Sequence, residues 1–185
     1  MGYKDSITEA FDIGYQGIRG QGIYKGRIIN RYLTFEAKGY YKFDFKIISK
    51  NSRNLQAIIL LLSKEFTAEF YINGKKVKKP KGRFPQIQLW ENDVPEEFSV
   101  YVHIEDGELD ILNGCALPLS TISYCSMLSG GCAIFIEKKE DNHYRLNCND
   151  VDLDDDFDDF VFEVKFTEIS DEQKWIELAK QKHTN

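Results

Sequence analysis

The chain has 185 residues, of which 42% are hydrophobic, 14% aromatic and 29% charged, and its net charge is −6. This size and composition fit one folded domain and exclude a low-complexity or largely disordered chain. Residues 1–90 hold 17 Lys and Arg against 7 Asp and Glu, whereas residues 91–185 hold 7 against 23. Either the two halves neutralise each other within one fold, or the molecule presents two oppositely charged faces.

The first residues lack the apolar stretch that a secretion signal needs, and the longest apolar run, residues 57–62, is too short to span a bilayer. We therefore predict a cytoplasmic protein with no membrane partner. Gly14, Gly17 and Gly20 indicate that residues 1–21 form an irregular, flexible entry to the first strand.

Alternating apolar and polar residues predict the strands that form the core. In residues 41–47 the aromatic and aliphatic side chains fall on one face, and Lys42, Asp44 and Lys46 fall on the other. The same period of two recurs in residues 98–104 and 160–166. Shorter β-prone runs predict the remaining strands, at residues 22–29, 32–37, 57–62, 66–72, 75–77, 86–90, 109–112, 132–137 and 144–148.

Turn and helix signals complete the predicted fold. Asn73-Gly74 lies between two β-prone runs and predicts a tight hairpin. Ser170, followed three residues later by Gln173, resembles a capping box and predicts a short helix over residues 170–182. Because helices are too scarce for parallel crossover units, we predict one domain, residues 1–185, with an antiparallel all-β sandwich over residues 22–167.

The cysteines show no metal-binding spacing, and some lie in apolar strand contexts. Since we expect a reducing compartment, we predict buried thiols and no disulfide. These residues are Cys115, Cys125, Cys132 and Cys148.

A basic cluster follows the Asn73-Gly74 turn. It has no interleaved aromatic residues to stack on bases, and the negative net charge opposes attraction to a phosphate backbone. We interpret it as protection of an exposed edge strand and predict no nucleic-acid partner. The cluster comprises Lys75, Lys76, Lys78, Lys79, Lys81 and Arg83.

An acidic run stands directly before the strand at residues 160–166. Its carboxylates supply the hard oxygens that Ca²⁺ prefers, and the alternative is a solvated acidic loop. The candidate calcium ligands are Asp150, Asp152, Asp154, Asp156 and Asp158.

The catalytic inventory is small. Neither His103 nor His143 has a sequence neighbour that would form a recognisable nucleophile pair. The acidic turn at residues 105–110 offers carboxylates of the glycosidase type, as any acidic turn does. We therefore predict that the protein is not an enzyme.

Trp90 stands at the end of a predicted strand and precedes Asn92 and Asp93. An indole at a strand end either stacks on a sugar ring or covers the core. We take Trp90, Asn92 and Asp93 as the candidate ligand-binding residues.

The segments Phe70–Val77, Phe98–Val102 and Gly107–Gly114 resemble the hairpin succession of galactose-binding-like jelly-roll sandwiches, over roughly residues 32 to 167. The resemblance implies a jelly-roll-like β-sandwich whose ligand lies on end loops or on a concave sheet face, often beside a structural calcium ion. It assigns no sugar-contacting residue here.

These observations predict a non-catalytic binding module for a glycan or protein ligand. A second hypothesis is an acidic inhibitor of the immunity-protein type, which uses the excess of carboxylates after Trp90 to bind a basic partner. A hydrolase-type enzyme is the third.

Overall fold

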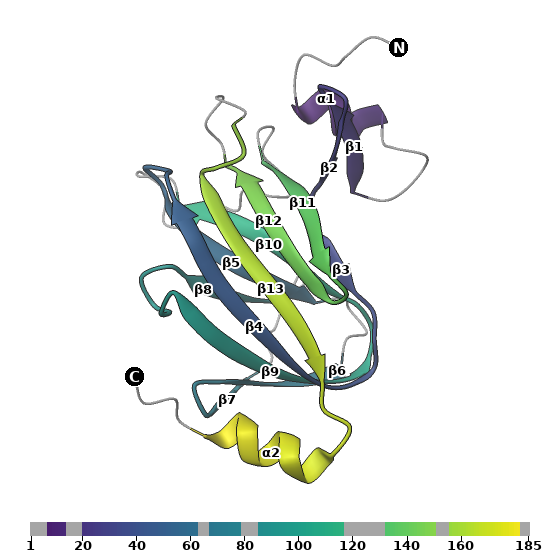
Figure 1. Ribbon diagram of the computed structural model, residues 1–185, viewed down its shortest axis with the longest axis vertical. Coiled ribbons are helices and arrows are strands. Elements are labelled where there is room, and N and C mark those ends of the chain that lie inside the picture. The colour runs from purple at the N-terminus through teal and green to yellow at the C-terminus, as the bar shows by residue number, and fades with distance from the viewer. Residues whose placement is uncertain are drawn as a thin grey trace.

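The computed structural model describes residues 7–13, 20–62, 67–78, 85–116, 132–150 and 156–181. Antiparallel strands in two sheets dominate this part of the chain, with a helix near each end (Figure 1). Apolar faces of both sheets share one core. The predicted all-β, sandwich-like architecture with a short C-terminal helix is therefore confirmed.

The larger sheet has nine strands, in the order β1-β2-β11-β12-β13-β4-β9-β6-β7, and the smaller has four, in the order β3-β10-β5-β8. The larger sheet contains β1 (Gln21–Tyr24), β2 (Arg27–Asn30), β4 (Gly39–Lys50), β6 (Thr67–Ile72), β7 (Lys75–Val77), β9 (Glu97–Asp106), β11 (Ala133–Glu140), β12 (His143–Asn149) and β13 (Phe160–Glu168). The smaller contains β3 (Leu33–Phe35), β5 (Leu55–Leu62), β8 (Gln86–Trp90) and β10 (Leu109–Ala116). The helices are α1 (Ile7–Ile13) and α2 (Glu172–Lys180).

The main core forms as the alternation in β4, β9 and β13 predicts. Their apolar side chains point at the smaller sheet, and Phe43, Val100 and Phe162 are completely buried. Phe35 of β3 packs against the ring of Phe43, with centroids 5.1 Å apart. Buried aromatic rings at this interface supply much of the apolar area that leaves water on folding.

Two tight hairpins depend on residues with positive φ angles. Asn73 and Gly74 have φ values of 50° and 73°, which confirms the predicted turn between β6 and β7. Lys25 and Gly26 adopt the same pattern, at 45° and 78°, between β1 and β2. The single strand predicted over residues 22–29 is therefore wrong, because this turn divides it into two paired strands.

We predicted an irregular segment over residues 1–21. The prediction is wrong for residues 7–13, which form α1. α1 packs closely on β1: a Cβ atom at Gly22 would lie 2.6 Å from the backbone oxygen of Ala10. Figure 1 shows α1, β1 and β2 together at one end of the molecule. With the first residue of β11 they form a small separate core of Ile7, Ala10, Tyr24, Ile29 and Ala133.

Helix α2 begins one residue later than the capping pattern predicts. Asp171, not Ser170, is the N-cap residue, and its side chain accepts a hydrogen bond from the backbone N–H of Lys174 at 3.0 Å. The chain is still held to the sheet at Ile169, whose N–H donates to the carbonyl of Tyr40 at 2.8 Å.

Trp175 anchors α2 against the outer face of the larger sheet. The indole is 2% exposed, and its Nε1–H donates to the backbone oxygen of Tyr41 at 3.2 Å. Around it, Tyr40 stacks on His103 with ring centroids 4.1 Å apart, and Tyr71 meets the indole edge-on. His103 is therefore part of the packing under α2.

Three of the cysteines are buried thiols outside any disulfide, as predicted: Cys115, Cys132 and Cys148. Cys125 lies outside the described residues. Neither described helix is long and apolar enough to cross a membrane.

Strand β7 is the last strand of the larger sheet, and its Lys75 and Lys76 are exposed. This position fits the edge-strand interpretation of the basic cluster. Lys79, Lys81 and Arg83 lie outside the described residues.

Candidate functional site

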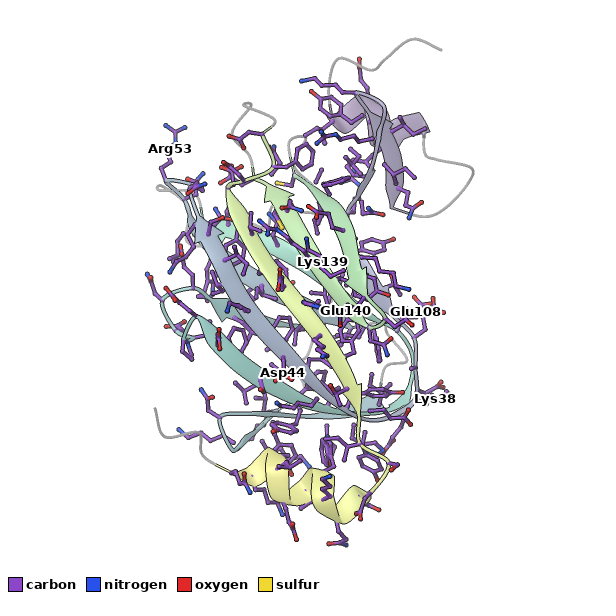
Figure 2. All side chains as sticks on the ribbon, in the orientation of Figure 1. Lys38, Asp44, Arg53, Glu108, Lys139 and Glu140 are labelled. Atoms are coloured by element: carbon purple, nitrogen blue, oxygen red, sulfur yellow. The ribbon has the colours of Figure 1, made fainter. Side chains whose placement is uncertain are left out.

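A groove of about 800 Å³ crosses the outer face of the larger sheet. The alternation that sends Phe43 and Phe45 into the core directs Lys42, Asp44 and Lys46 of β4 outwards. Neighbouring strands add polar residues at the same level, and Asp44 is labelled in Figure 2. The groove is lined by Lys42, Asp44, Phe45, Lys46, Asn73, Pro95, Glu96, Glu97, Phe98, Ser99, His143, Glu163 and Lys165.

Strand register makes the charges in this groove alternate in sign. Lys46 lies opposite both Glu97 of β9 and Glu163 of β13, and its Nζ is 2.6 Å from Oε1 of Glu97. That hydrogen bond raises the pKa of Lys46. Two residues before Lys46 on β4, Asp44 lies opposite Lys165 of β13. Asp44 accepts a hydrogen bond from the Ser99 hydroxyl at 2.6 Å. Opposite charges facing each other across strands stabilise this arrangement.

His143 and Glu163 form the groove's most sheltered pair of ionisable side chains. Nε2 of His143 is 3.2 Å from Oε2 of Glu163, and both side chains are only about a quarter exposed or less, at 25% and 21%. In the part of the chain that the structure describes, Glu163 is the residue hydrogen-bonded to His143, and the Ser99 hydroxyl donates to Asp44.

Ion pairs join the basic first half of the sequence to the acidic second half. Lys46 pairs with Glu97, and Lys38 pairs with Asp106 at 2.7 Å, which lowers the pKa of the Asp106 carboxyl through the same hydrogen bond. Lys50 lies 3.6 Å from an oxygen of Glu91. The uneven charge distribution is therefore partly neutralised inside one sandwich.

The predicted ligand-binding residues lie together but outside the groove. Trp90 ends β8 opposite Ala57 and is half-buried against the main core. Asn92 and Asp93 are exposed in the following turn, where the N–H of Asp93 donates to the carbonyl of Trp90 at 2.8 Å. Core packing accounts for much of the indole's surface, and sugar stacking by its exposed part stays a prediction.

The acidic run divides between the interior and the surface. Asp150 is fully buried, whereas Asp156 and Asp158 are exposed. Asp152 and Asp154 lie outside the described residues. Among those that are described, no group of three or more His, Cys, Asp or Glu side chains is arranged to hold a metal ion. A calcium ion bound by Asp150 to Asp158 stays a prediction.

Buried donors surround the carboxylate of Asp150. Its Oδ2 accepts hydrogen bonds from the Ser52 hydroxyl, from Nδ2 of Asn54 at 3.1 Å and from Nε2 of Gln56 at 3.0 Å. Its own N–H donates to Oδ2 of Asp159 at 2.8 Å. This polar network ties the loop after β12 to the chain around the start of β5.

No family model, curated protein or solved structure matches this chain. The likeness to galactose-binding-like sandwiches therefore rests on the strand pattern, and the function has to be inferred from the geometry of the groove. The alternation in three strands predicted which of the groove residues face outwards, namely Lys42, Asp44, Lys46, Ser99, Glu163 and Lys165. The pairing with Glu97 and Glu163 required the register of strands distant in the sequence.

Proposed function

We propose that this protein is a non-catalytic binding module and that it holds a glycan in the groove across β4, β9, β12 and β13. The supporting observation is the hollowed sheet face itself, whose volume of about 800 Å³ lies within the range of ligand sites. Sugar hydroxyl groups both donate and accept hydrogen bonds. The carboxylates of the groove can accept hydrogen bonds from sugar hydroxyl groups, and its ammonium groups can donate hydrogen bonds to them.

The pairing of the groove's charges favours a neutral ligand. Asp44 is 2.7 Å from the ammonium of Lys42, Glu97 is held by Lys46, and Glu163 contacts His143. A charged ligand would have to displace one partner of such a pair, whereas a polyhydroxylated ligand can bond to both partners together.

The test is a glycan array, followed by titration calorimetry of each sugar that binds. We expect Asp44→Asn combined with Glu163→Gln to weaken binding by about tenfold or more, because hydrogen bonds to charged groups contribute strongly. Glu105→Gln combined with Glu177→Gln makes the same change in net charge at exposed sites outside the groove. Absence of binding to every glycan, or an equal loss in this control, would refute the proposal.

A protein ligand of the basic kind is the second candidate. It is favoured by the exposed carboxylates near α2, namely Glu168, Asp171, Glu172 and Glu177. Such a surface would speed the association of an inhibitor of the immunity-protein type with a basic partner and make it sensitive to salt. Pull-down at low and high salt distinguishes the two candidates, because binding of a neutral glycan depends little on ionic strength.

The third candidate is a hydrolase that uses the His143–Glu163 pair for general acid–base catalysis. Each glycan found on the array should therefore be incubated with the protein and analysed for cleavage by mass spectrometry. The binding-module proposal predicts intact glycan, and turnover that is lost in Glu163→Gln would replace it.

A further inference from the structure

The turn between β6 and β7 connects the groove to helix α2. Asn73, the first residue of this turn, lines the groove. Ile72, directly before it, pairs with Val100 of β9, and the groove residue Ser99 directly precedes Val100. The tip of the β6–β7 hairpin therefore borders the groove at the outer side of β9.

Asn73 offers the groove a neutral side chain that belongs to no ion pair. The groove carboxylates Asp44, Glu97 and Glu163 each contact a basic side chain. The Asn73 side chain is exposed, and its amide is hydrogen-bonded to no residue in the part of the chain that the structure describes. An amide both donates and accepts hydrogen bonds, as a sugar hydroxyl does, so a glycan can bond to Asn73 without separating two charges.

The C-terminal end of α2 packs directly against the next residue of the turn. A Cβ atom at Gly74 would lie 2.9 Å from the backbone oxygen of Lys180 and 3.0 Å from that of Gln181. The backbone of the turn and the backbone of the helix end are thus in close contact, with no room for a side chain between them. Figure 1 shows α2 beside the β6–β7 hairpin at one end of the molecule.

A second contact joins α2 to the hairpin on the other side of Asn73. Trp175 of α2 meets Tyr71 of β6 edge-on, with ring centroids 5.6 Å apart. Helix α2 has only nine residues, and a helix of this length is not stable without such an anchor. Strand β7 has only three residues and is the last strand of its sheet, so the hairpin gains its support from α2.

We propose that Asn73 binds the glycan through its side-chain amide and that docked α2 regulates the groove by holding Asn73 in place. The inference rests on the proposed glycan groove. When α2 is docked, the turn is held on both sides of Asn73. When α2 leaves the sheet, both contacts are lost and the amide is no longer fixed at the groove. Since the glycan binds the docked form more tightly, its binding must in turn stabilise the docking of α2.

The first experiment is titration calorimetry of the full chain with cellotetraose, maltotetraose, lacto-N-tetraose and the glycans that the array selects. Asn73→Gly removes the amide and keeps a residue that tolerates positive φ, and it should weaken binding by about three- to tenfold. Lys25→Gly makes the equivalent change in the β1–β2 turn, where φ is 45° instead of 50°, and should leave binding unchanged.

The second variant separates the turn from the helix. Gly74→Ala inserts a methyl group against the backbone of Lys180 and should weaken glycan binding by a similar factor. Gly26→Ala is the matched control, because Gly26 has a φ of 78° against 73° for Gly74 and lies outside the groove. Asn73→Gly combined with Gly74→Ala should lose little more than either change alone, because both act through one side chain.

Hydrogen exchange of the unmodified protein tests the same coupling without a variant, and it decides the question if Gly74→Ala does not fold. Saturation with a bound glycan should raise the protection of the α2 amides. Unchanged protection of α2, or an equal effect of Gly74→Ala and Gly26→Ala, would overturn the regulation by α2.

The outcomes also separate this inference from the glycan groove itself. If Asp44→Asn combined with Glu163→Gln weakens binding but Asn73→Gly does not, the groove stands and the role of Asn73 is refuted. If no glycan binds the unmodified protein, the proposed function fails, and the present inference fails with it.

Discussion

Gln56 of the smaller sheet donates a hydrogen bond from Nε2 to Oδ2 of Asp150, which follows β12 of the larger sheet, at 3.0 Å. The same Nε2 also donates to the carbonyl of Asn54, so the orientation of the amide is well determined. Both side chains are fully buried. The bond therefore connects the two layers of the sandwich inside a polar cluster that water does not reach.

Replacing Asp150 should destabilise the fold whether or not calcium is present. Asp150→Ala leaves the donors of Ser52, Asn54 and Gln56 without their acceptor, and we expect the free energy of unfolding to fall by about 3 kcal/mol or more. Urea denaturation with calcium and with chelator measures this. With chelator present, Asp158→Ala, at an exposed position, should change stability by less than about 0.5 kcal/mol. A loss seen only with calcium present would assign Asp150 to the metal instead.

Asn113 is expected to reduce the stability of the protein. It is fully buried on β10, and neither Nδ2 nor Oδ1 has a hydrogen-bond partner among the described residues. Asn113→Leu replaces the amide with an apolar group of similar volume, which should raise the free energy of unfolding by about 1–3 kcal/mol in urea denaturation. The surface change Asn92→Leu should have little effect. A large loss of stability would instead indicate that an internal water satisfies the amide of Asn113.

Gly114 is required by close packing with Ile59. A Cβ atom at position 114 would lie 2.4 Å from Cδ1 of Ile59, a side chain that is itself 2% exposed. Gly114→Ala should therefore cost about 1–3 kcal/mol. Ile59→Val removes the clashing methyl group, so the double variant should lose less than the sum of the two single changes. Thermal and urea denaturation of the three variants gives the coupling, and strict additivity would contradict this explanation.

Trp175 should carry most of the energy that holds α2 on the sheet. Trp175→Ala removes a buried indole and its hydrogen bond to Tyr41, at an expected cost of about 3–5 kcal/mol. The neighbouring Glu177→Ala, on the exposed side of the helix, should change stability by less than about 0.5 kcal/mol. Hydrogen exchange would locate the effect, with protection lost in α2 before β4. Uniform loss across the sheets would instead place the role of Trp175 in the main core.

Local sequence patterns were sufficient to predict a side chain's environment where that environment depends on its immediate neighbours in the chain. The alternation in β4 correctly separates Phe43 and Phe45 from Asp44 and Lys46, because a strand's side chains point to opposite faces. Asn73-Gly74 identifies its own turn for a similar reason, since both residues tolerate positive φ. Where two local signals competed, the choice was wrong: Ser170 and Asp171 are both good N-caps, and it is the Asp171 side chain that accepts the hydrogen bond from the backbone N–H of Lys174.

Local sequence patterns do not give the order and register of the strands. These are known only from the tertiary structure. The groove combines β4 with β9, β12 and β13, which are far apart in the sequence. No periodicity within a strand specifies which distant strand will lie next to it, because that choice depends on how all the apolar faces close over one core. Composition and alternation therefore determined an antiparallel β-sandwich with a solvent-exposed outer face. Packing alone decided which charged side chains meet on that face.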